Sequence, residues 1–223
     1  MPRAFAEISF TPSVLELQER HGSAENYAGF LEPDAERADR IGPEEEQFIL
    51  QRDGFYQATV AQSGWPYVQF RGGPVGFLKV MDDATIGYAD YRGNRQYLSA
   101  GNLQDDDRVS LILMDYPNRR RLKIWGRAKL LDAKEDALLM SKLRDPAYRA
   151  LPERAVIVSV EALDWNCPSH IPQRLTVQEL KPALAPLQNE IARLTAQNEE
   201  LRIALTLKQN AGTGSKDTDG PDG

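Results

Sequence analysis

The chain has 223 residues, 41% of them hydrophobic and 27% charged, which is typical of a globular protein with one main domain. Its formal net charge of -6 argues against general affinity for nucleic acid, and no apolar run approaches the ~20 residues that a membrane-spanning helix needs. The N-terminus lacks the apolar core of a secretion signal, and the one cysteine, Cys167, cannot form an intrachain disulfide. We therefore expect a cytoplasmic protein that binds neither nucleic acid nor membrane.

The first part of the chain, residues 1–42, is polar and interrupted by proline and glycine. This composition predicts an N-terminal helical and irregular segment, with short helices over residues 13–18 and 25–30. The main domain is expected over residues 43–175. It opens with Pro43 followed by three glutamates, a pattern that favours the first turn of a helix.

Alternating apolar and polar residues predict the strands of this domain. The first four, over residues 55–61, 65–71, 76–81 and 84–90, are separated by tight turns and are expected to form an antiparallel meander. Further strands are expected over residues 109–114, 122–131 and 155–163, with a helix over 133–143. Short, mostly antiparallel strands with helices inserted between them predict a mainly β fold, a small closed or split barrel.

Residues 92–97 have the character of an anion-binding loop. They follow a predicted strand and lead into helical spacing over residues 96–103. Glycine lets the backbone approach an anion, Asn94 is suited to cap the first helical turn, and free amides at a helix N-terminus favour negative charge. Arg92 and Arg95 add two permanent cations. The alternative is an ordinary hairpin-to-helix turn with solvated arginines.

Residues 176–209 differ from the rest of the chain, because apolar side chains recur there at alternating spacings of three and four. This seam predicts a C-terminal coiled-coil helix, with Asn198 as its polar member. Pro182 and Pro186 limit a continuous helix to the part after about residue 187. The seam consists of Val177, Leu180, Leu184, Leu187, Ile191, Leu194, Asn198, Leu201 and Leu205.

Pairing of this helix with another copy, parallel and two-stranded, is favoured by asparagine and β-branched residues at a positions and leucine at d positions. The alternative is an amphipathic helix folded back on its own domain. Residues 210–223 are small and polar and are expected to form a disordered tail.

Four sequence blocks together resemble the pyridoxamine 5'-phosphate oxidase-like flavoproteins in order and spacing. They are FRGGPVGFLK (residues 70–79), GYADYRGNRQY (87–97), DRVSLILMDYP (107–117) and WGRA (125–128). The segment DWNCPSHI (164–171) resembles a bacterial subgroup of predicted flavin-nucleotide-binding members. The resemblance implies an FMN-binding split β-barrel, a homodimer with FMN at the subunit interface.

The resemblance also implies cofactor-binding residues. Arg71 and Lys79 correspond to residues that contact the flavin, and the loop that holds its phosphate corresponds to Asn94, Arg95 and Gln96. A helix N-terminus with guanidinium groups matches the charge and geometry of a phosphate, which makes Arg95 the strongest single candidate. For Lys79 the alternative is a solvent-facing strand lysine.

Further candidates lie within, between and after these blocks. Tyr88 packs against the flavin ring or, as is favoured, in the barrel core. Arg121 belongs to a basic run that reaches the flavin or substrate across the dimer, or else forms a solvated turn. Trp165 and Arg174 are the counterparts that the resemblance implies for a tryptophan and an arginine at the flavin and substrate.

The region that includes Trp165 also holds His170, one of two histidines in the chain. His170 either donates to the flavin or acts as an acid, or it is an ordinary surface or capping histidine. Cys167 has no second cysteine beside it and is expected to be a buried small thiol. No spacing of ligands typical of a metal site occurs.

The chain departs from the true oxidases in two motifs. An Arg-Pro-x-x-Ser substrate-phosphate motif is missing, and the Arg-x-His near the C-terminus of those enzymes is Arg174-Leu175-Thr176 here. We therefore expect an FMN-dependent oxidoreductase that acts on an unidentified small substrate other than pyridoxamine phosphate, with catalytic residues unassigned. The alternatives are a non-catalytic flavin-binding sensor or interaction protein, and a split-barrel relative that binds haem or another cofactor.

Overall fold

The computed structural model describes residues 2–165 and 168–213, and the chain divides into two units, Met1–Gln173 and Arg174–Gly223. The first unit carries every strand of the described chain, and the second carries one long helix. Within the described residues, no helix combines the length and the apolar character needed to cross a bilayer.

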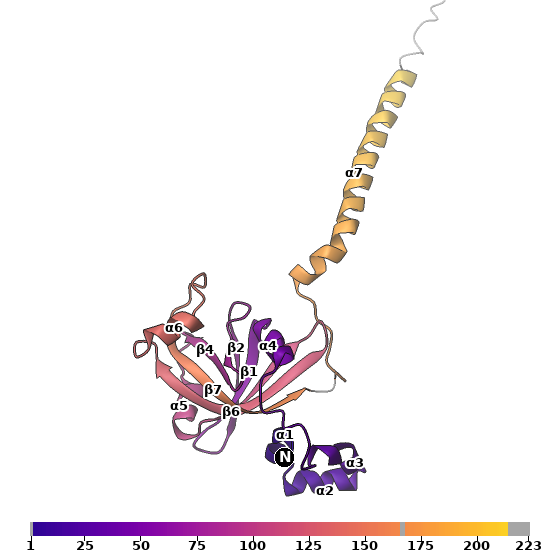
Figure 1. Ribbon diagram of the computed structural model, residues 1–223. Coiled ribbons are helices and arrows are strands. Elements are labelled where there is room, and N and C mark those ends of the chain that lie inside the picture. Colours follow the sequence, from indigo (N-terminus) through magenta and orange to yellow (C-terminus); the bar gives the residue numbers. More distant parts are fainter. Residues whose placement is uncertain (1, 166–167, 214–223) are drawn as a thin grey trace, which may run out of the picture. The chain divides into compact units, whose positions relative to one another are not determined.

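Short helices precede the sheet: α1 (Ala4–Ser9), α2 (Pro12–Arg20), α3 (Ala24–Tyr27) and η1 (Ala28–Phe30). The helices expected over residues 13–18 and 25–30 are thus present. Ala4 and Ala6 of α1 are buried, and the ring centroid of Phe5 lies 5.1 Å from that of Trp125. The N-terminal segment therefore packs on the sheet through α1 (Figure 1).

The sheet has seven strands in the order β2-β1-β5-β6-β7-β4-β3, and every neighbouring pair is antiparallel. The strands are β1 (Gly54–Val60), β2 (Pro66–Gly72), β3 (Lys79–Asp82), β4 (Thr85–Tyr91), β5 (Arg108–Asp115), β6 (Arg120–Asp132) and β7 (Pro152–Trp165). Helix α4 (Pro43–Leu50) precedes β1, α5 (Leu98–Asp105) follows β4, and α6 (Ala137–Leu143) lies between β6 and β7. The bent sheet with its inserted helices is the split β-barrel that the sequence predicted (Figure 1).

The expected four-strand meander is wrong. β1 and β2 form one hairpin and β3 and β4 another, but β2 and β3 lie at opposite ends of the strand order. The apolar residues Phe77 and Leu78, which looked like the start of a strand, are instead buried in the connecting segment, where Gly76 adopts a φ of 74°. Strand β3 consequently begins only at Lys79, and β4 pairs with β3 on one side and with β7 on the other.

Two helix boundaries also differ from those expected. The helix predicted over residues 133–143 begins at Ala137, because Asp136 caps it by accepting a hydrogen bond of 2.8 Å from the backbone N–H of Leu139. The helix predicted from residue 96 begins at Leu98. In both cases the apolar spacing continues into a polar turn that precedes the helix.

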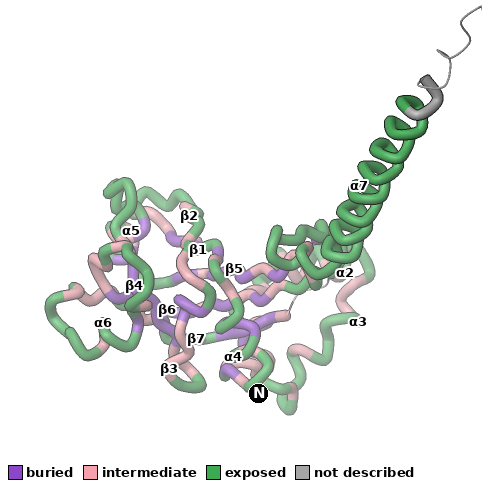
Figure 2. Tube along the Cα trace, turned by 90° about the horizontal axis from the view of Figure 1, so that it is seen from above, coloured by how far each residue is buried: buried purple, intermediate pink, exposed green. Residues whose placement is uncertain are grey.

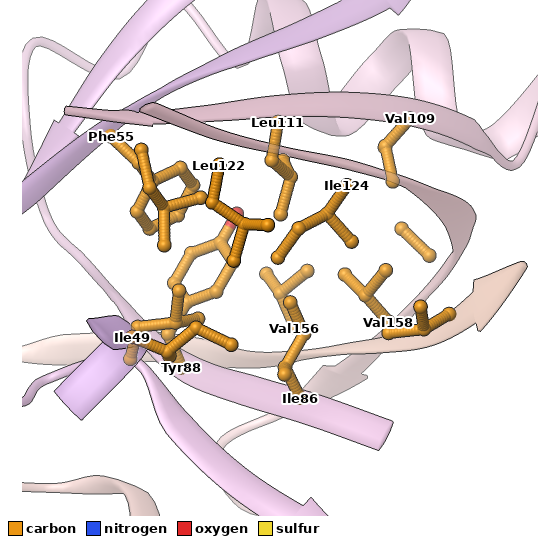
Figure 3. Close-up of a cluster of buried hydrophobic side chains, with 14 of the residues drawn as sticks. Ile49, Phe55, Ile86, Tyr88, Val109, Leu111, Leu122, Ile124, Val156 and Val158 are labelled. Carbon is orange, nitrogen blue, oxygen red and sulfur yellow. The ribbon is translucent and has the colours of Figure 1, made fainter. Parts of the chain in front are cut away.

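The core lies inside the curve of the sheet. Side chains from β1, β4, β5, β6 and β7 meet there and are covered by α4, as Figure 3 shows for Phe55, Tyr88, Leu111, Ile124 and Ile49. Each of these five side chains is at most 1% exposed. Tyr88 carries the polar group of this cluster, and its hydroxyl donates to Oε1 of Gln57, itself buried. The barrel interior is therefore filled by side chains.

Gly126→Ala is expected to lower the free energy of unfolding by about 1–3 kcal/mol, the range for overpacking. A Cβ atom at this position would stand 2.3 Å from the carbonyl oxygen of Ser159 on β7, where the strand register shifts. The measurement is urea unfolding. Gly101→Ala is the matched control, because nothing lies within 4 Å of its Cβ and alanine favours the helix α5. Equal stability of the two variants would contradict the β6–β7 packing.

The second unit contains α7 (Val177–Thr213), which continues through Pro182 and Pro186, so the expected limit near residue 187 is wrong. A capping box starts the helix. The hydroxyl of Thr176 accepts from the backbone N–H of Glu179, whose carboxylate accepts from the backbone N–H of Thr176. The helix thus begins nine residues before the second proline and contains both prolines. Figure 2 shows the described part of α7 exposed along its length.

Candidate functional site

The loop between β4 and α5 has an unusual backbone. Arg95 and Tyr97 adopt left-handed conformations, with φ of 64° and 56°, which non-glycine residues rarely take. Asn94 does not cap α5 as expected. Its Oδ1 accepts from the backbone N–H of Gln96 at 3.2 Å and so closes a turn inside the loop, while Tyr97 holds the N-cap position. Strained backbone of this kind is typical of ligand-binding sites.

This loop borders a cleft of about 420 Å³ in the first unit. Its lining comes from β2, β4, the loop, the start of α5, and the segment that leads into β7. The charged residues of the lining are Arg71, Asp90, Arg92, Arg95, Glu153 and Arg154. Aromatic side chains of Phe70, Phe77, Tyr91, Tyr97 and Tyr148 line it as well.

The cleft is cationic. Four arginines and two carboxylates line it, so its formal charge is +2. Asp90 joins two of the arginines, with Oδ1 2.6 Å from Nη1 of Arg71 and Oδ2 3.6 Å from Nε of Arg154. Nearer the rim, Nε of Arg92 lies 2.9 Å from the carboxylate of Glu153. These pairs hold guanidinium groups from three different chain segments beside one another.

One buried arginine donor in the cleft is unused. Nε of Arg71 is buried and has no hydrogen-bond partner among the described residues. Buried donors in proteins are almost always satisfied, and one left without a partner indicates a ligand or water that the protein alone does not supply. Because the Arg71 side chain is only 16% exposed, the group it binds must enter the cleft.

Burial changes the proton affinity of two groups beside Arg71. It raises the pKa of Asp90 above its ordinary value, and attraction by Arg71 and Arg154 opposes this rise without cancelling it. Burial also raises the pKa of Tyr88, which stays a neutral phenol. Tyr88 belongs to the core, as the favoured interpretation has it, and one side of it also lines the cleft.

The structure brings four of the sequence-derived candidates to this cleft: Arg71, Tyr88, Asn94 and Arg95. Gln96 lies in the same loop without lining the cleft. Arg174 belongs to the second unit, and Cys167, the proposed buried thiol, lies outside the described residues. The four remaining candidates, Lys79, Arg121, Trp165 and His170, do not line the cleft of this chain.

Those four candidates lie in other places. Lys79 begins β3, opposite Gly87. Trp165 ends β7, where its Nε1 donates to Oε1 of Glu45 at 2.6 Å and its ring packs against Phe48. Arg121 lies on β6 with its Nε buried and without a partner among the described residues, whereas His170 is exposed with a φ of 64°. Trp165 therefore ties β7 to α4 within its own chain.

Three other members of the basic region around Arg121 form ion pairs. Arg120 pairs with Glu44, Nζ of Lys123 lies 3.1 Å from Asp164, and Arg127 pairs with Asp107 and Glu161. Neutralised by these carboxylates, the run is a set of structural contacts between strands and α4.

Sequence reasoning missed Arg154 and Glu153, which complete the cleft from the start of β7. The residues stand 56 or more positions after the loop that they face. Their place in the cleft follows from the β4–β7 register, which sets Asp90 opposite Arg154. A correct strand order was needed to find them.

Comparisons with known proteins agree with the fold. A family model described as pyridoxamine 5'-phosphate oxidase matches residues 41–162, more than half of the chain. Among curated proteins, none matches this sequence.

Similar solved structures include an FMN-binding protein of Syntrophomonas wolfei, with 10% identity, a TM-score of 0.44, and coverage of 70% of this chain and 97% of that one. General Stress Protein 26 of Bacillus anthracis is 14% identical, with a TM-score of 0.42 and coverage of 55% and 91%. The heme storage protein HutZ of Vibrio cholerae is 17% identical, with a TM-score of 0.37 and coverage of 56% and 94%.

Proposed function

The chain belongs to the pyridoxamine 5'-phosphate oxidase family, and from that premise we propose that it is an FMN-dependent oxidoreductase whose cofactor lies in the cationic cleft. The observation that carries the proposal is the buried Nε of Arg71, which has no partner among the described residues and lines this cleft. A flavin mononucleotide offers both an anion and hydrogen-bond acceptors to such a donor.

The charge of the cleft fits a phosphate monoester. Such a group carries about -1.5 to -2 at neutral pH, and the formal charge of the cleft is +2. Arg92 and Arg95 stand at the loop, where guanidinium groups and backbone N–H groups are suited to bind phosphate oxygens. We assign the phosphate to this loop and the flavin ring to the part of the cleft beside Arg71.

The lining also fits a flat aromatic ring. Six aromatic side chains, Tyr88 among them, contribute to it, and ring stacking and edge contacts orient a flavin. When bound, FMN supplies the redox chemistry, while the protein supplies orientation, electrostatics and exclusion of water. Arg71 is suited to stabilise negative charge on the ring.

We propose that a second copy completes each site. Tyr56, Val68 and Phe70 are 40%, 59% and 57% exposed on the hairpin of β1 and the edge strand β2, and the rings of Tyr56 and Phe70 lie 5.4 Å apart. Such a patch is typical of an interface. In a dimer, Lys79, Arg121, His170 and Arg174 are the candidates that reach a cofactor held by the partner. A cytoplasmic location is part of this proposal.

The substrate is an unidentified small molecule other than pyridoxamine phosphate, because the substrate-phosphate motif of the oxidases is missing from the sequence. Haem is a weaker fit to the cleft. Of its usual axial ligands, histidine, cysteine and methionine are not among the described residues that line the cleft, and only tyrosine is. A sensor that binds FMN without catalysis is the second candidate function.

The test is the visible spectrum of the purified full-length protein, followed by release and identification of its cofactor. We expect a yellow protein, or a colourless one that binds one added FMN per cleft. A haem spectrum, or failure to take up FMN, would overturn the proposal. The rate at which a panel of electron acceptors reoxidises the reduced, protein-bound flavin is then measured. Repeated turnover with one acceptor indicates an oxidoreductase, and its absence indicates a sensor.

Arg95→Ala is expected to weaken FMN binding at least about tenfold, because a charge-assisted contact to the phosphate is lost. The measurement is a fluorescence titration of the apoprotein with FMN. Riboflavin, which has no phosphate, should bind both proteins equally. The control is Arg108→Ala, which removes another exposed arginine, paired with Asp106 outside the cleft. Unchanged FMN affinity of Arg95→Ala would show that the phosphate lies elsewhere.

A further inference from the structure

Helix α7 carries an apolar stripe from Val177 to Leu205, interrupted by Asn198. Its a positions are Val177, Leu184, Ile191, Asn198 and Leu205, and its d positions are Leu180, Leu187, Leu194, Leu201 and Lys208. Seven of the apolar members are between 41% and 74% exposed. The helix has 37 residues, which corresponds to about 55 Å at 1.5 Å per residue. An amphipathic helix draws most of its stability from packing of such a stripe.

The two prolines lie away from the stripe. In the heptad that starts at Val177, Pro182 takes an f position and Pro186 a c position, both on the outer side of a two-stranded coiled coil. Neither ring therefore stands between the helix and a partner. Because α7 is continuous through both prolines, five a positions and five d positions are available from Val177 onward, where the sequence alone indicated about three heptads.

The charges at the e and g positions, which flank the stripe, permit self-association. In a parallel pair each g residue faces the e residue of the next heptad on the other helix. Glu190 then faces Thr195, and Gln197 faces Arg202. Neither contact joins like charges, so two identical helices meet without repulsion. An outer ion pair within one helix, between Glu190 and Arg193 at 2.7 Å, leaves this contact free.

Asn198 decides the direction of pairing. In a parallel pair, residues at a face the same position of the other helix, so two Asn198 amides meet and can hydrogen-bond to each other. In an antiparallel pair, a positions face d positions. The Nδ2 group of Asn198 would keep its bond of 3.1 Å to the Leu194 carbonyl of its own helix, but its Oδ1 would be buried against leucine without a donor from the partner, which is unfavourable. β-Branched Val177 and Ile191 at a, with leucine at d, favour two strands.

We propose that α7 forms a parallel, in-register, two-stranded coiled coil with α7 of a second copy of this chain. The pairing extends from Val177 through Leu205, with Asn198 facing its counterpart. The side chains of this coiled coil do not line the cofactor cleft, so its test does not depend on whether the protein binds FMN.

The test is disulfide crosslinking of the full-length chain in a Cys167→Ser background. Leu201→Cys places a thiol at a d position, where the two copies face each other, and Glu200→Cys places one at the neighbouring outer c position as the matched control. With oxidised glutathione as oxidant, Leu201→Cys should form covalent dimers at least about tenfold faster than Glu200→Cys. Leu194→Cys, at the preceding d position, should behave like Leu201→Cys.

Equal crosslinking of the outer and stripe positions would overturn the proposal, as would the absence of crosslinks at both Leu194 and Leu201. Either result would indicate that the stripe packs on another surface. As a second measurement, Asn198→Leu should raise the melting temperature of α7 helicity and add species larger than two strands, seen by light scattering. Asparagine at an a position specifies the register and lowers stability. A lower melting temperature of Asn198→Leu would contradict this role for Asn198.

Discussion

Arg71→Ala is expected to lower the free energy of unfolding by about 3 kcal/mol, the lower end of the range for breaking a buried ion pair. Its guanidinium lies 2.6 Å from Asp90, and both side chains are at least 84% buried. Without Arg71, the Asp90 carboxylate keeps only Arg154 at 3.6 Å. The same substitution should weaken FMN binding by about 10- to 140-fold, since a charge-assisted hydrogen bond contributes ~1.5–3 kcal/mol.

The double variant Arg71→Ala/Asp90→Asn separates these two effects. It removes the carboxylate that Arg71 leaves behind, so stability in urea should recover most of the loss while FMN affinity stays low. If the double variant is as unstable as Arg71→Ala, the ion pair is not the source of the stability loss. If FMN binds Arg71→Ala as tightly as the wild type, the free Nε of Arg71 does not face the cofactor.

The stability loss in Arg71→Ala should depend on pH. Because the pKa of Asp90 is raised in the folded state, its contribution to stability is fully present below the ordinary Asp pKa of about 3.9 and is lost as pH rises through the raised value. Attraction by Arg71 opposes the rise of the Asp90 pKa. Removal of Arg71 therefore raises this pKa further, and the stability lost on ionisation of Asp90 becomes larger. Urea unfolding should show a larger deficit at pH 7 than at pH 5, and no such trend with Asp90→Asn present.

The strands were predictable from the sequence, whereas their order was not. Alternation places each strand within a few residues of its observed bounds, because the buried side chains of β5 and β7 are mostly apolar. The order depends on what happens between β2 and β3. Phe77 and Leu78 are apolar in either case, and only the packed structure shows that they fill the core instead of extending a strand.

The candidate site divides along the same line. Arg71, Asn94 and Arg95 lie in short motifs and were found locally, but Arg154 joins them only through the β4–β7 pairing, which depends on contacts between distant segments. The sequence also carries a local signal for the start of α7, the Thr-x-x-Glu capping box at Thr176. The helix begins at this cap, although Pro182 lies six residues after Thr176.

Phe55→Ala is expected to lower the free energy of unfolding by about 3–5 kcal/mol, the range for truncating a buried phenylalanine. The Phe55 side chain is 0% exposed, its ring stacks on Phe77 at 5.6 Å, and the edge-on ring of Tyr88 lies 5.3 Å away. Because the protein interior is close-packed, removal of the ring leaves a cavity that these two neighbours only partly fill. Urea unfolding measures the loss, and Leu138→Ala, at a side chain 70% exposed on α6, should stay within about 0.5 kcal/mol of the wild type.

The cavity should also be felt at the cofactor. Phe77 and Tyr88 both line the cleft, so the ring of Phe55 supports the wall against which the flavin is proposed to lie. FMN affinity should therefore fall in Phe55→Ala at temperatures where the protein remains folded by circular dichroism, although Phe55 does not itself line the cleft. Loss of stability with unchanged FMN affinity would mean that the cleft wall is held by the strands alone, and that core packing and cofactor binding are independent in this barrel.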